Sequence, residues 1–279
     1  MTSDRKAVLR PKGMVKRRLP LLALLILCLA IFAVSAYMLI SHYVQGNREE
    51  SAFQELAEVV AAEETSTAES DDARPAATTG EPEAGTNVFS GYQKLHEQNS
   101  DMVGWIKIDG TAIDYPVMYT PYDGDYYLTR GFDKQKAKSG VPFIDQRCVL
   151  EPPGSNTIIY GHHMKNGTMF AGLEQYKDEE FFKEHPTIRF DTLHKRQEYE
   201  IIAVFESRIY APNEKVFKHY NFINANSQAD FDEYMRNINA LSLYETGVNA
   251  SYGDELVTLI TCDYKVEDGQ MVVVAVKKS

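Results

Sequence analysis

An uncharged apolar run near the N-terminus constrains the fold of this 279-residue chain more than any other feature. Between Leu19 and Val44 there is no Asp, Glu, Lys or Arg. As a helix, the first 21 of these residues would be about 31 Å long, which matches the hydrocarbon core of a bilayer. The run therefore predicts one transmembrane helix within residues 19–44, followed by the rest of the protein.

A cleaved signal peptide is the alternative interpretation of this run. The run is long for a signal peptide, and the best cleavage point, at residues 33–36, is followed by further apolar residues, so a retained anchor is favoured. The tail at residues 1–18 has seven basic residues against one acidic residue. The positive-inside rule therefore places this tail in the cytoplasm and everything after about Tyr43 outside the cell.

The segment at residues 45–86 has the composition of an acidic flexible linker. From Glu49 to Thr86 it has eleven acidic residues and one basic residue, Arg74. Such a segment repels itself and buries too little apolar surface to fold, so a disordered tether is expected. Four apolar residues near its start have helical spacing: Phe53, Leu56, Val59 and Val60. A short amphipathic helix is therefore expected before the flexible part.

Residues 87–279 are long enough to bury a single hydrophobic core, and their pattern is mainly β. Seven short runs of β-branched and aromatic residues, bounded by Gly, Asp, Asn or Pro, are predicted strands: 104–108, 113–118, 156–160, 187–190, 198–206, 256–261 and 271–276. Seven or eight short strands favour a closed barrel. Helices are expected near residues 89–99 and at residues 227–241, where Ser227 and Asp230 form a capping box before a core-facing apolar stripe.

Charge and cysteine content exclude several classes of function. The net charge of −11 argues against nucleic-acid binding by the body of the protein. The three cysteines, Cys28, Cys148 and Cys262, are too scattered for a disulfide framework, and no cluster has the spacing of a metal site. We therefore expect no metal and no cofactor. Cys28 falls inside the predicted membrane helix.

Cys262 is the candidate nucleophile. It ends the apolar run at residues 256–261 and precedes a polar turn, so its thiol is expected at the mouth of a strand. A lone cysteine is more often a small buried apolar residue, so this assignment requires a partner base. A disulfide between Cys148 and Cys262 is not expected, because it would silence the nucleophile.

His162 is the candidate partner among the seven histidines. His162 and His163 follow the predicted strand at residues 156–160 and Gly161, which lets the backbone turn at the strand end and present an imidazole at the edge. The other five are expected at the membrane edge, in solvated loops or on helix faces: His42, His96, His185, His194 and His219.

Five segments, in one order along the chain, resemble those of a known family: Asn99-Ser-Asp-Met-Val-Gly-Trp-Ile-Lys-Ile108, Ile113-Asp-Tyr-Pro-Val117, Asp125-Tyr-Tyr-Leu128, Ile159-Tyr-Gly-His-His-Met-Lys-Asn-Gly-Thr-Met-Phe170 and Thr258-Leu-Ile-Thr-Cys262. From about residue 88 to residue 276, the chain resembles the class B sortases. The resemblance implies an eight-stranded sortase-type β-barrel with flanking helices. The helix at residues 227–241 is similar to the extra helix that class B members carry between late barrel strands.

The resemblance also implies a transpeptidase that works in two steps without a cofactor. Cys262 would cleave a C-terminal sorting signal of a secreted protein and hold the acyl group as a thioester, while His162 would move the protons. The signal would be Asn-Pro-x-Thr-like or Leu-Pro-x-Thr-like, and the acceptor would be an amine of a cell-wall precursor or a pilin. His163 is expected to line the site or to form a hydrogen bond.

One position departs from the family pattern in a way that affects activity. Sortases carry an arginine, on the strand after the cysteine, that holds the substrate and the developing oxyanion. Gln270 occupies this position, eight residues after Cys262. An amide donates hydrogen bonds but adds no charge, so reduced activity is expected. Ile260 also departs, because many class B members have a serine there. Three arginines are candidate substitutes for the charge, with surface or ion-paired roles favoured for each: Arg130, Arg147 and Arg208.

Three functions therefore follow from the sequence. The favoured one is a membrane-anchored transpeptidase on the outer face of the cell. Because of Gln270, the alternative is a catalytically weakened sortase-like barrel that binds sorting signals or assembly partners. The third is a thiol peptidase that transfers the acyl group only to water.

Overall fold

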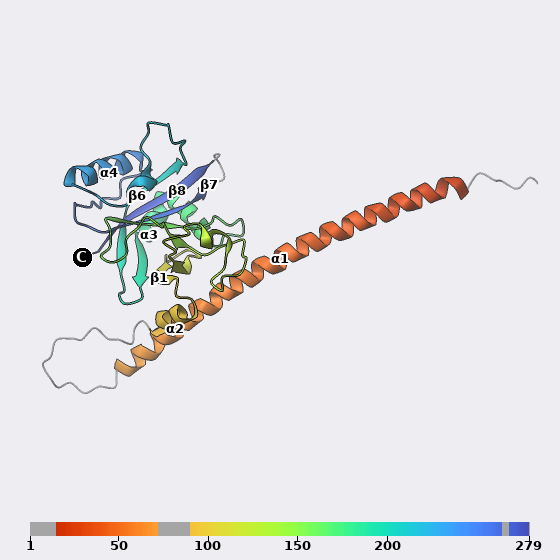
Figure 1. The fold of residues 1–279 in the computed structure, drawn as a ribbon, viewed down its shortest axis with the longest axis horizontal. Helices are drawn as coiled ribbons and strands as arrows, with labels where there is room; N and C mark the ends of the chain where they lie inside the picture. Colours follow the sequence, from red (N-terminus) through yellow and green to blue (C-terminus); the bar gives the residue numbers. More distant parts are fainter. Residues whose placement is uncertain (1–14, 72–89, 264–267, 279) are drawn as a thin grey trace, which may run out of the picture. The chain divides into compact units, whose positions relative to one another are not determined.

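The computed structural model describes residues 15–71, 90–263 and 268–278 of the chain (Figure 1). It leaves out the side chains of residues 15–21, 42, 45, 47, 63–71, 262 and 263. The chain divides into two units, residues 1–48 and residues 49–279. The predicted strands and the candidate site residues all belong to the second unit.

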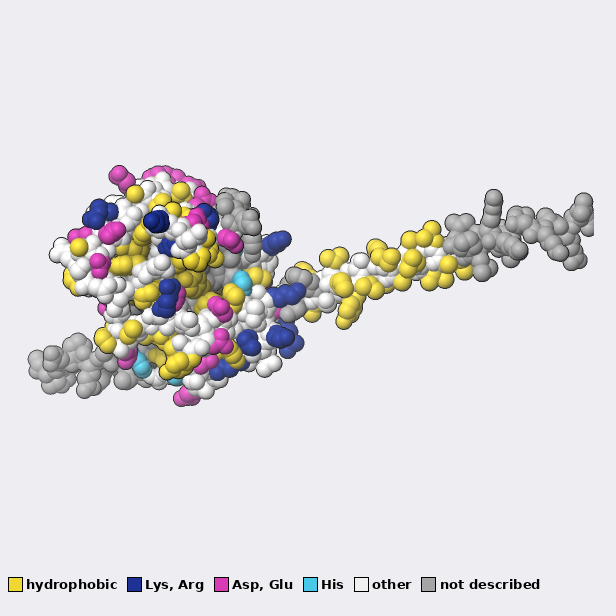
Figure 2. Space-filling model, turned by 45° about the horizontal axis from the view of Figure 1, so that its top comes forward, with side chains coloured by type: hydrophobic (Ala, Val, Ile, Leu, Met, Phe, Trp, Pro, Cys, Tyr) yellow, Lys and Arg dark blue, Asp and Glu magenta, His cyan; other side chains and the backbone are white. Residues whose placement is uncertain are grey.

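Helix α1 (Val15–Asp71) begins in the first unit and ends in the second. Its segment Leu22–Ser41 has a mean hydropathy of 2.7, and its large apolar side chains are exposed (Figure 2). Of the helices that the structure describes, α1 is the one with the length and composition to cross a membrane. This helix agrees with the predicted transmembrane segment. Most of the basic tail, residues 1–14, lies outside the described residues.

The second unit is built around a closed barrel, for which the described part of the chain supplies eight strands. They are β1 (Met102–Lys107), β2 (Asp114–Met118), β3 (Phe143–Ile144), β4 (Asn156–Tyr160), β5 (Thr187–Thr192), β6 (Glu198–Arg208), β7 (Leu256–Asp263) and β8 (Gly269–Lys277). Their order around the barrel is β1-β2-β3-β4-β7-β8-β6-β5. Neighbours are antiparallel except for the parallel pairs β2 with β3 and β4 with β7. The predicted eight-stranded barrel is confirmed.

Both predicted helices of this unit are present. Helix α4 (Gln228–Leu241) begins after Ser227, whose Oγ accepts a hydrogen bond from the Asp230 N–H (3.2 Å). It buries most of the predicted apolar stripe: Phe231, Tyr234, Met235 and Ile238. Helix α2 (Ser90–Gln98) buries Tyr92 and Leu95. The connections between strands also contain α3 (Glu179–Glu184) and the 3₁₀ turns η1 (Tyr126–Thr129), η2 (Phe170–Lys177) and η3 (His219–Asn221).

The start of the predicted linker is part of helix α1 and packs on the barrel. Phe53 and Val60 are each 6% exposed. Three more residues of the segment pack partly buried against the same core: Leu56, Ala57 and Val59. The amphipathic helix expected here is observed, and it continues to Asp71, since no Gly or Pro interrupts residues 49–71. The boundaries of the flexible linker, residues 45–86, stay a prediction, because residues 72–89 lie outside the described part.

Candidate active site

The parallel strands β4 and β7 lead to the predicted histidine and cysteine. Their pairing ends with Tyr160 opposite Ile260. The Gly161 N–H donates to the Ile260 carbonyl (3.1 Å), which closes this last pair. His162 follows Tyr160 by two residues, and Cys262 follows Ile260 by two residues in β7. The parallel pairing therefore brings together the two segments from which the predicted histidine and cysteine come.

Strand β8 carries the third predicted residue, Gln270. It runs antiparallel to β7, and Gln270 pairs directly with Cys262. On its other side, Gln270 pairs with Ser207 of β6. The backbone therefore places Gln270 directly opposite Cys262 on a neighbouring strand. The side chain of Cys262 lies outside the described residues, so its catalytic role stays a prediction.

The imidazole of His162 has a defined orientation. Its Nε2 lies 2.7 Å from the backbone carbonyl oxygen of Leu128, in turn η1. A carbonyl oxygen only accepts hydrogen bonds, so Nε2 carries the hydrogen and the neutral ring presents Nδ1 as its basic atom. The backbone is held as well, because the His162 carbonyl accepts from the Phe170 N–H (2.8 Å). The structure thus fixes both the ring and the main chain of the candidate base.

The loop after β4 folds back in a tight turn. Glycine is required at Gly161, because a Cβ there would lie 2.5 Å from the ring of Phe170. His163 pairs with Met169 in an isolated antiparallel bridge, and Met169 adopts a positive φ of 56°. The two adjacent histidines therefore have different surroundings.

Gln270 is buried beside a histidine that the sequence did not single out. The Gln270 side chain is 8% exposed, and His219, in η3, is fully buried. The His219 ring meets the ring of Phe205, on β6, edge to face with 5.5 Å between centroids. Burial lowers the pKa of His219 to about 4, and hydrogen bonding to the Gln270 side chain partly opposes this shift. His219 is therefore neutral at physiological pH.

The contact between Gln270 and His219 leaves hydrogen-bonding capacity unused. Within the part of the chain that the structure describes, neither His219 ring nitrogen nor the Oε1 of Gln270 has a partner at regular hydrogen-bond geometry. The two side chains lie close enough for their interaction to affect the pKa of His219. The expectation that His219 lies in solvated surroundings is wrong. It is buried and packs on Phe205 of the preceding strand, β6.

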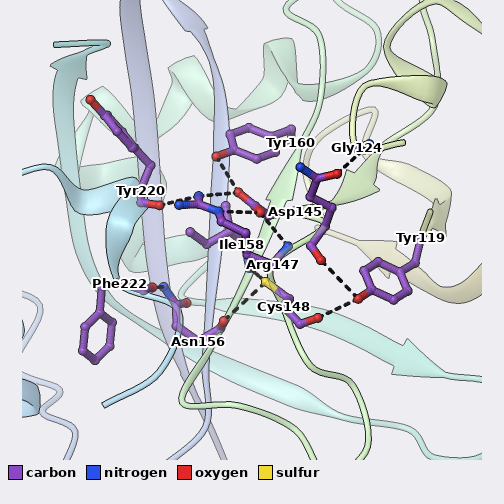
Figure 3. Close-up of polar contacts among 11 residues, drawn as sticks. Tyr119, Gly124, Asp145, Arg147, Cys148, Asn156, Ile158, Tyr160, Tyr220 and Phe222 are labelled. Atoms are coloured by element: carbon purple, nitrogen blue, oxygen red, sulfur yellow. Dashed lines mark hydrogen bonds and ion pairs between the residues drawn. The ribbon is translucent and has the colours of Figure 1, made fainter. Parts of the chain in front are cut away.

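Arg147 is held in a polar cluster beside β4 (Figure 3). It forms a two-point ion pair with Asp145, with Nε–Oδ1 at 2.9 Å and Nη2–Oδ2 at 2.6 Å, and it donates to the Tyr220 carbonyl (2.7 Å). Asp145 also accepts from the Tyr160 hydroxyl (3.2 Å). Burial alone would raise the pKa of Asp145, but these hydrogen bonds outweigh it and the pKa is lowered. The cluster connects the end of β4 to the residue after His219.

Arg130 and Arg208 have partners of their own. The Arg130 guanidinium lies over the Tyr126 ring, 4.2 Å from its centroid. Arg208 pairs with Glu214 (2.7 Å) and lies over the Tyr210 ring. These contacts agree with the surface or ion-paired roles that the sequence favoured for the three arginines.

Besides Cys262, the described part of the barrel unit has a second cysteine, Cys148. No metal-ligand cluster is found among the described residues. Cys148 is free and buried, and its Sγ lies 3.7 Å from the Asn156 carbonyl oxygen and 3.4 Å from the Ile158 nitrogen. Burial raises the pKa of this thiol to about 11. A thiol that stays protonated is a poor nucleophile, so Cys148 is suited to packing.

The closed eight-stranded barrel, with β4 and β7 as parallel neighbours, has the architecture of a sortase-type barrel protein. Residues 106–278 match the family model of the sortase domain. The match covers more than half of the chain, and the chain therefore belongs to the sortase family, whose members are cysteine transpeptidases.

The relatives also identify the class. Sortase B of Listeria monocytogenes is 38% identical over 181 residues, covering 64% of this chain and 70% of that protein. Sortase B of Staphylococcus aureus is 30% identical over 188 residues, covering 66% and 73%. The solved structure of Clostridium perfringens sortase B is 31% identical with a TM-score of 0.61, and covers 67% of this chain and 100% of that one. A Staphylococcus aureus sortase B-substrate complex, at 24% identity, supports the fold with a TM-score of 0.68 over 85% of this chain and 99% of that one. The resemblance to class B sortases is confirmed.

The lowered pKa of Asp145 predicts a pH dependence of stability. The charged carboxylate stabilises the fold above its unfolded-state pKa, and this contribution is lost as the pH falls through the lowered folded-state pKa. We expect Asp145→Asn to reduce the free energy of unfolding by about 1–3 kcal/mol near neutral pH, because the buried carboxylate loses its charge-assisted hydrogen bonds to the exposed Arg147 side chain. Urea unfolding at neutral and at strongly acidic pH measures the effect, which should shrink in acid. Asp123→Asn, at an exposed position, is the control, and an equal loss at both pH values would contradict the prediction.

Proposed function

We propose that this sortase cleaves a C-terminal sorting signal of secreted proteins with Cys262 and transfers the acyl group to an amine of a cell-wall precursor or a pilin. The observation that supports this most is the parallel pairing of β4 with β7, because His162 and Cys262 each come two residues after its last pair, Tyr160 with Ile260. Thiol-dependent acyl transfer requires a base beside the nucleophile. Membership of the sortase family supports the reaction class.

The proposed reaction has two steps. In the first, the Cys262 thiolate attacks the carbonyl carbon of the scissile peptide bond, the C–N bond breaks, and the leaving amine takes a proton from the His162 imidazolium. The acyl group remains on sulfur as a thioester. In the second, the acceptor amine attacks the thioester and gives a proton to His162, while sulfur leaves as the thiolate. Nδ1 of His162 exchanges the proton, since Nε2 is bonded to the Leu128 carbonyl.

Gln270 is proposed to stabilise the oxyanion that forms in both steps. Its backbone pairs with Cys262, at the level where the substrate carbonyl oxygen would become negative. An N–H of the neutral His219 ring can donate to Oε1 of Gln270, and the amide nitrogen is then left to donate to the substrate. The amide supplies a hydrogen bond without a charge, so the proposed enzyme is a slow one.

The proposed substrate is an Asn-Pro-x-Thr-like signal, with a Leu-Pro-x-Thr-like signal as the second candidate. The solved Staphylococcus aureus relative is a sortase B-substrate complex, which supports substrate binding by this fold. Peptides of both kinds, incubated with and without an added amine, identify the preferred signal. Mass spectrometry of the products also separates transpeptidation from simple hydrolysis.

The roles of the two residue pairs are tested by substitution. Cys262→Ala is expected to abolish the acyl intermediate and the transfer product, because the thiol is the attacking group. His162→Ala is expected to be almost as damaging, whereas His163→Ala and Cys148→Ala keep most of the activity. Mass spectrometry of the acyl-enzyme and of the product measures both. Equal losses at the two histidines, or an intermediate retained in Cys262→Ala, would remove the case for this pair.

The oxyanion role is tested at Gln270 by single-turnover measurement of thioester formation. Gln270→Arg is expected to increase the rate, because arginine adds a fixed charge and a fork of donors. Gln270→Ala is expected to decrease it by up to about 100-fold, the cost of losing one oxyanion donor. If neither change matters, another group serves the oxyanion. If only the arginine variant forms a thioester, the alternative function, a barrel that binds sorting signals or assembly partners, describes the natural protein better.

The proposed orientation places the barrel outside the cell, with the N-terminus in the cytoplasm. Helix α1 has a segment able to span a membrane, and the basic residues before it favour the cytoplasmic side. Protease added to intact cells without their wall is expected to remove the barrel unit. Protection of the barrel until the membrane is broken would reverse the assignment.

A further inference from the structure

The end of helix α1 packs on a barrel that is closed without it. Each of the eight strands in the described chain already pairs with a neighbour on both sides. Even so, residues 49–60 bury Phe53 and Val60 against the core of this unit. Two contacts of this segment lead to the loop and the turn that hold His162.

The first contact joins Phe53 to Tyr115 of β2, whose rings meet edge to face at 5.3 Å. The Tyr115 hydroxyl accepts a hydrogen bond from the Met169 N–H (3.1 Å). Met169 has a φ of 56°, a conformation that L-residues adopt rarely and that persists only with support from its surroundings. The next residue, Phe170, donates its N–H to the His162 carbonyl (2.8 Å). Phe53 thus packs against Tyr115, whose hydroxyl group accepts the hydrogen bond from Met169 in the loop after His162.

The second contact is made by Glu49. Its carboxylate accepts from the Lys138 N–H (3.2 Å) and from the Ser139 N–H (3.1 Å). The backbone on both sides of these two residues is hydrogen-bonded to turn η1. Within η1, the Leu128 carbonyl holds Nε2 of His162 (2.7 Å). Glu49 therefore braces the segment that supports the imidazole.

We propose that Glu49 and Phe53 are positioning residues for His162, an inference that rests on the proposed role of His162 in acyl transfer. Glu49 acts on the ring through η1, and Phe53 acts on the backbone of the loop through Tyr115. The two routes begin about one helical turn apart on α1 and end at different atoms of one residue. If this segment served only to pack on the barrel, the apolar side chain of Phe53 would be sufficient. The hydrogen bonds of the Glu49 carboxylate to two backbone N–H groups would not be needed. The complete chain with its helix α1 is then the fully active form.

The test uses the full chain in detergent micelles with three changes: Glu49→Ala, Phe53→Ala and Tyr115→Phe. The third keeps the ring and removes the hydroxyl group that Met169 contacts. We expect each change to lower kcat by roughly 10- to 100-fold with little change in KM, because small displacements of a catalytic group have effects of this size. The exposed residue Glu58 supplies the control on the same helix, and Glu58→Ala should keep the wild-type kcat.

A second measurement separates positioning from simple packing. The ¹⁵N NMR signals of the His162 ring, which report its tautomer and its titration, are expected to shift in all three variants and not in Glu58→Ala. A lower melting temperature with unchanged kcat and unchanged ring signals overturns the inference. If Phe53→Ala fails to fold, Tyr115→Phe and Glu49→Ala decide the matter.

The failure of this inference is distinguishable from failure of the proposed function. His162→Ala is measured beside the other variants. If it retains full activity, the catalytic role of His162 is refuted and the positioning role falls with it. If His162→Ala is inactive while the three variants behave like wild type in both measurements, the catalytic role stands and the positioning role is refuted.

Discussion

The register between β4 and β7 is the constraint on which the rest of the site depends. Parallel neighbours need a long crossover, and this one contains β5, β6 and the helices α3 and α4. A shift of one residue would turn every side chain of β4 to the opposite face. The buried hydrogen bond from the Thr258 hydroxyl to Asn156 Oδ1 (2.8 Å) opposes such a shift, because it would leave polar groups unpaired inside the protein. Asn156 also donates to the Phe222 carbonyl (2.8 Å), which ties the same register to the segment that contains η3.

The surroundings of Gln270 combine burial with neutrality. Gln270 and His219 are both uncharged, so their burial requires hydrogen bonds and no counter-ion. Arg147 approaches this region through the Tyr220 carbonyl, but its charge is already balanced by Asp145. Gln270 and His219 are therefore two buried neutral side chains beside an ion pair that is already balanced.

The elements that the sequence predicted well have local signals. Strand β4 has its predicted bounds, because a short β-branched run ends there at Gly161, and α4 follows the predicted cap at Ser227. The two-residue strand β3 has no such signal. The burial of His219 has no local sequence signal, since it arises from tertiary packing that includes the ring of Phe205 on β6. The expectation that His162, Cys262 and Gln270 share one site came from the resemblance as much as from the residues, and their chemical roles remain predictions.

Glu49 shows why acidic composition alone misdescribes the segment after the apolar helix. Removing a carboxylate from water costs the most free energy when no hydrogen-bond donor replaces the water. Glu49 accepts hydrogen bonds from two backbone N–H groups. The other acidic residues of the same stretch with described side chains, Glu50, Glu55 and Glu58, are exposed. Helical periodicity therefore sorts the charges to solvent and the apolar residues to the barrel. Acidic composition predicts an unpacked segment only where the charges fall on the face that would be buried. Here Glu49, the one partly buried carboxylate among these four residues, accepts hydrogen bonds from two backbone N–H groups.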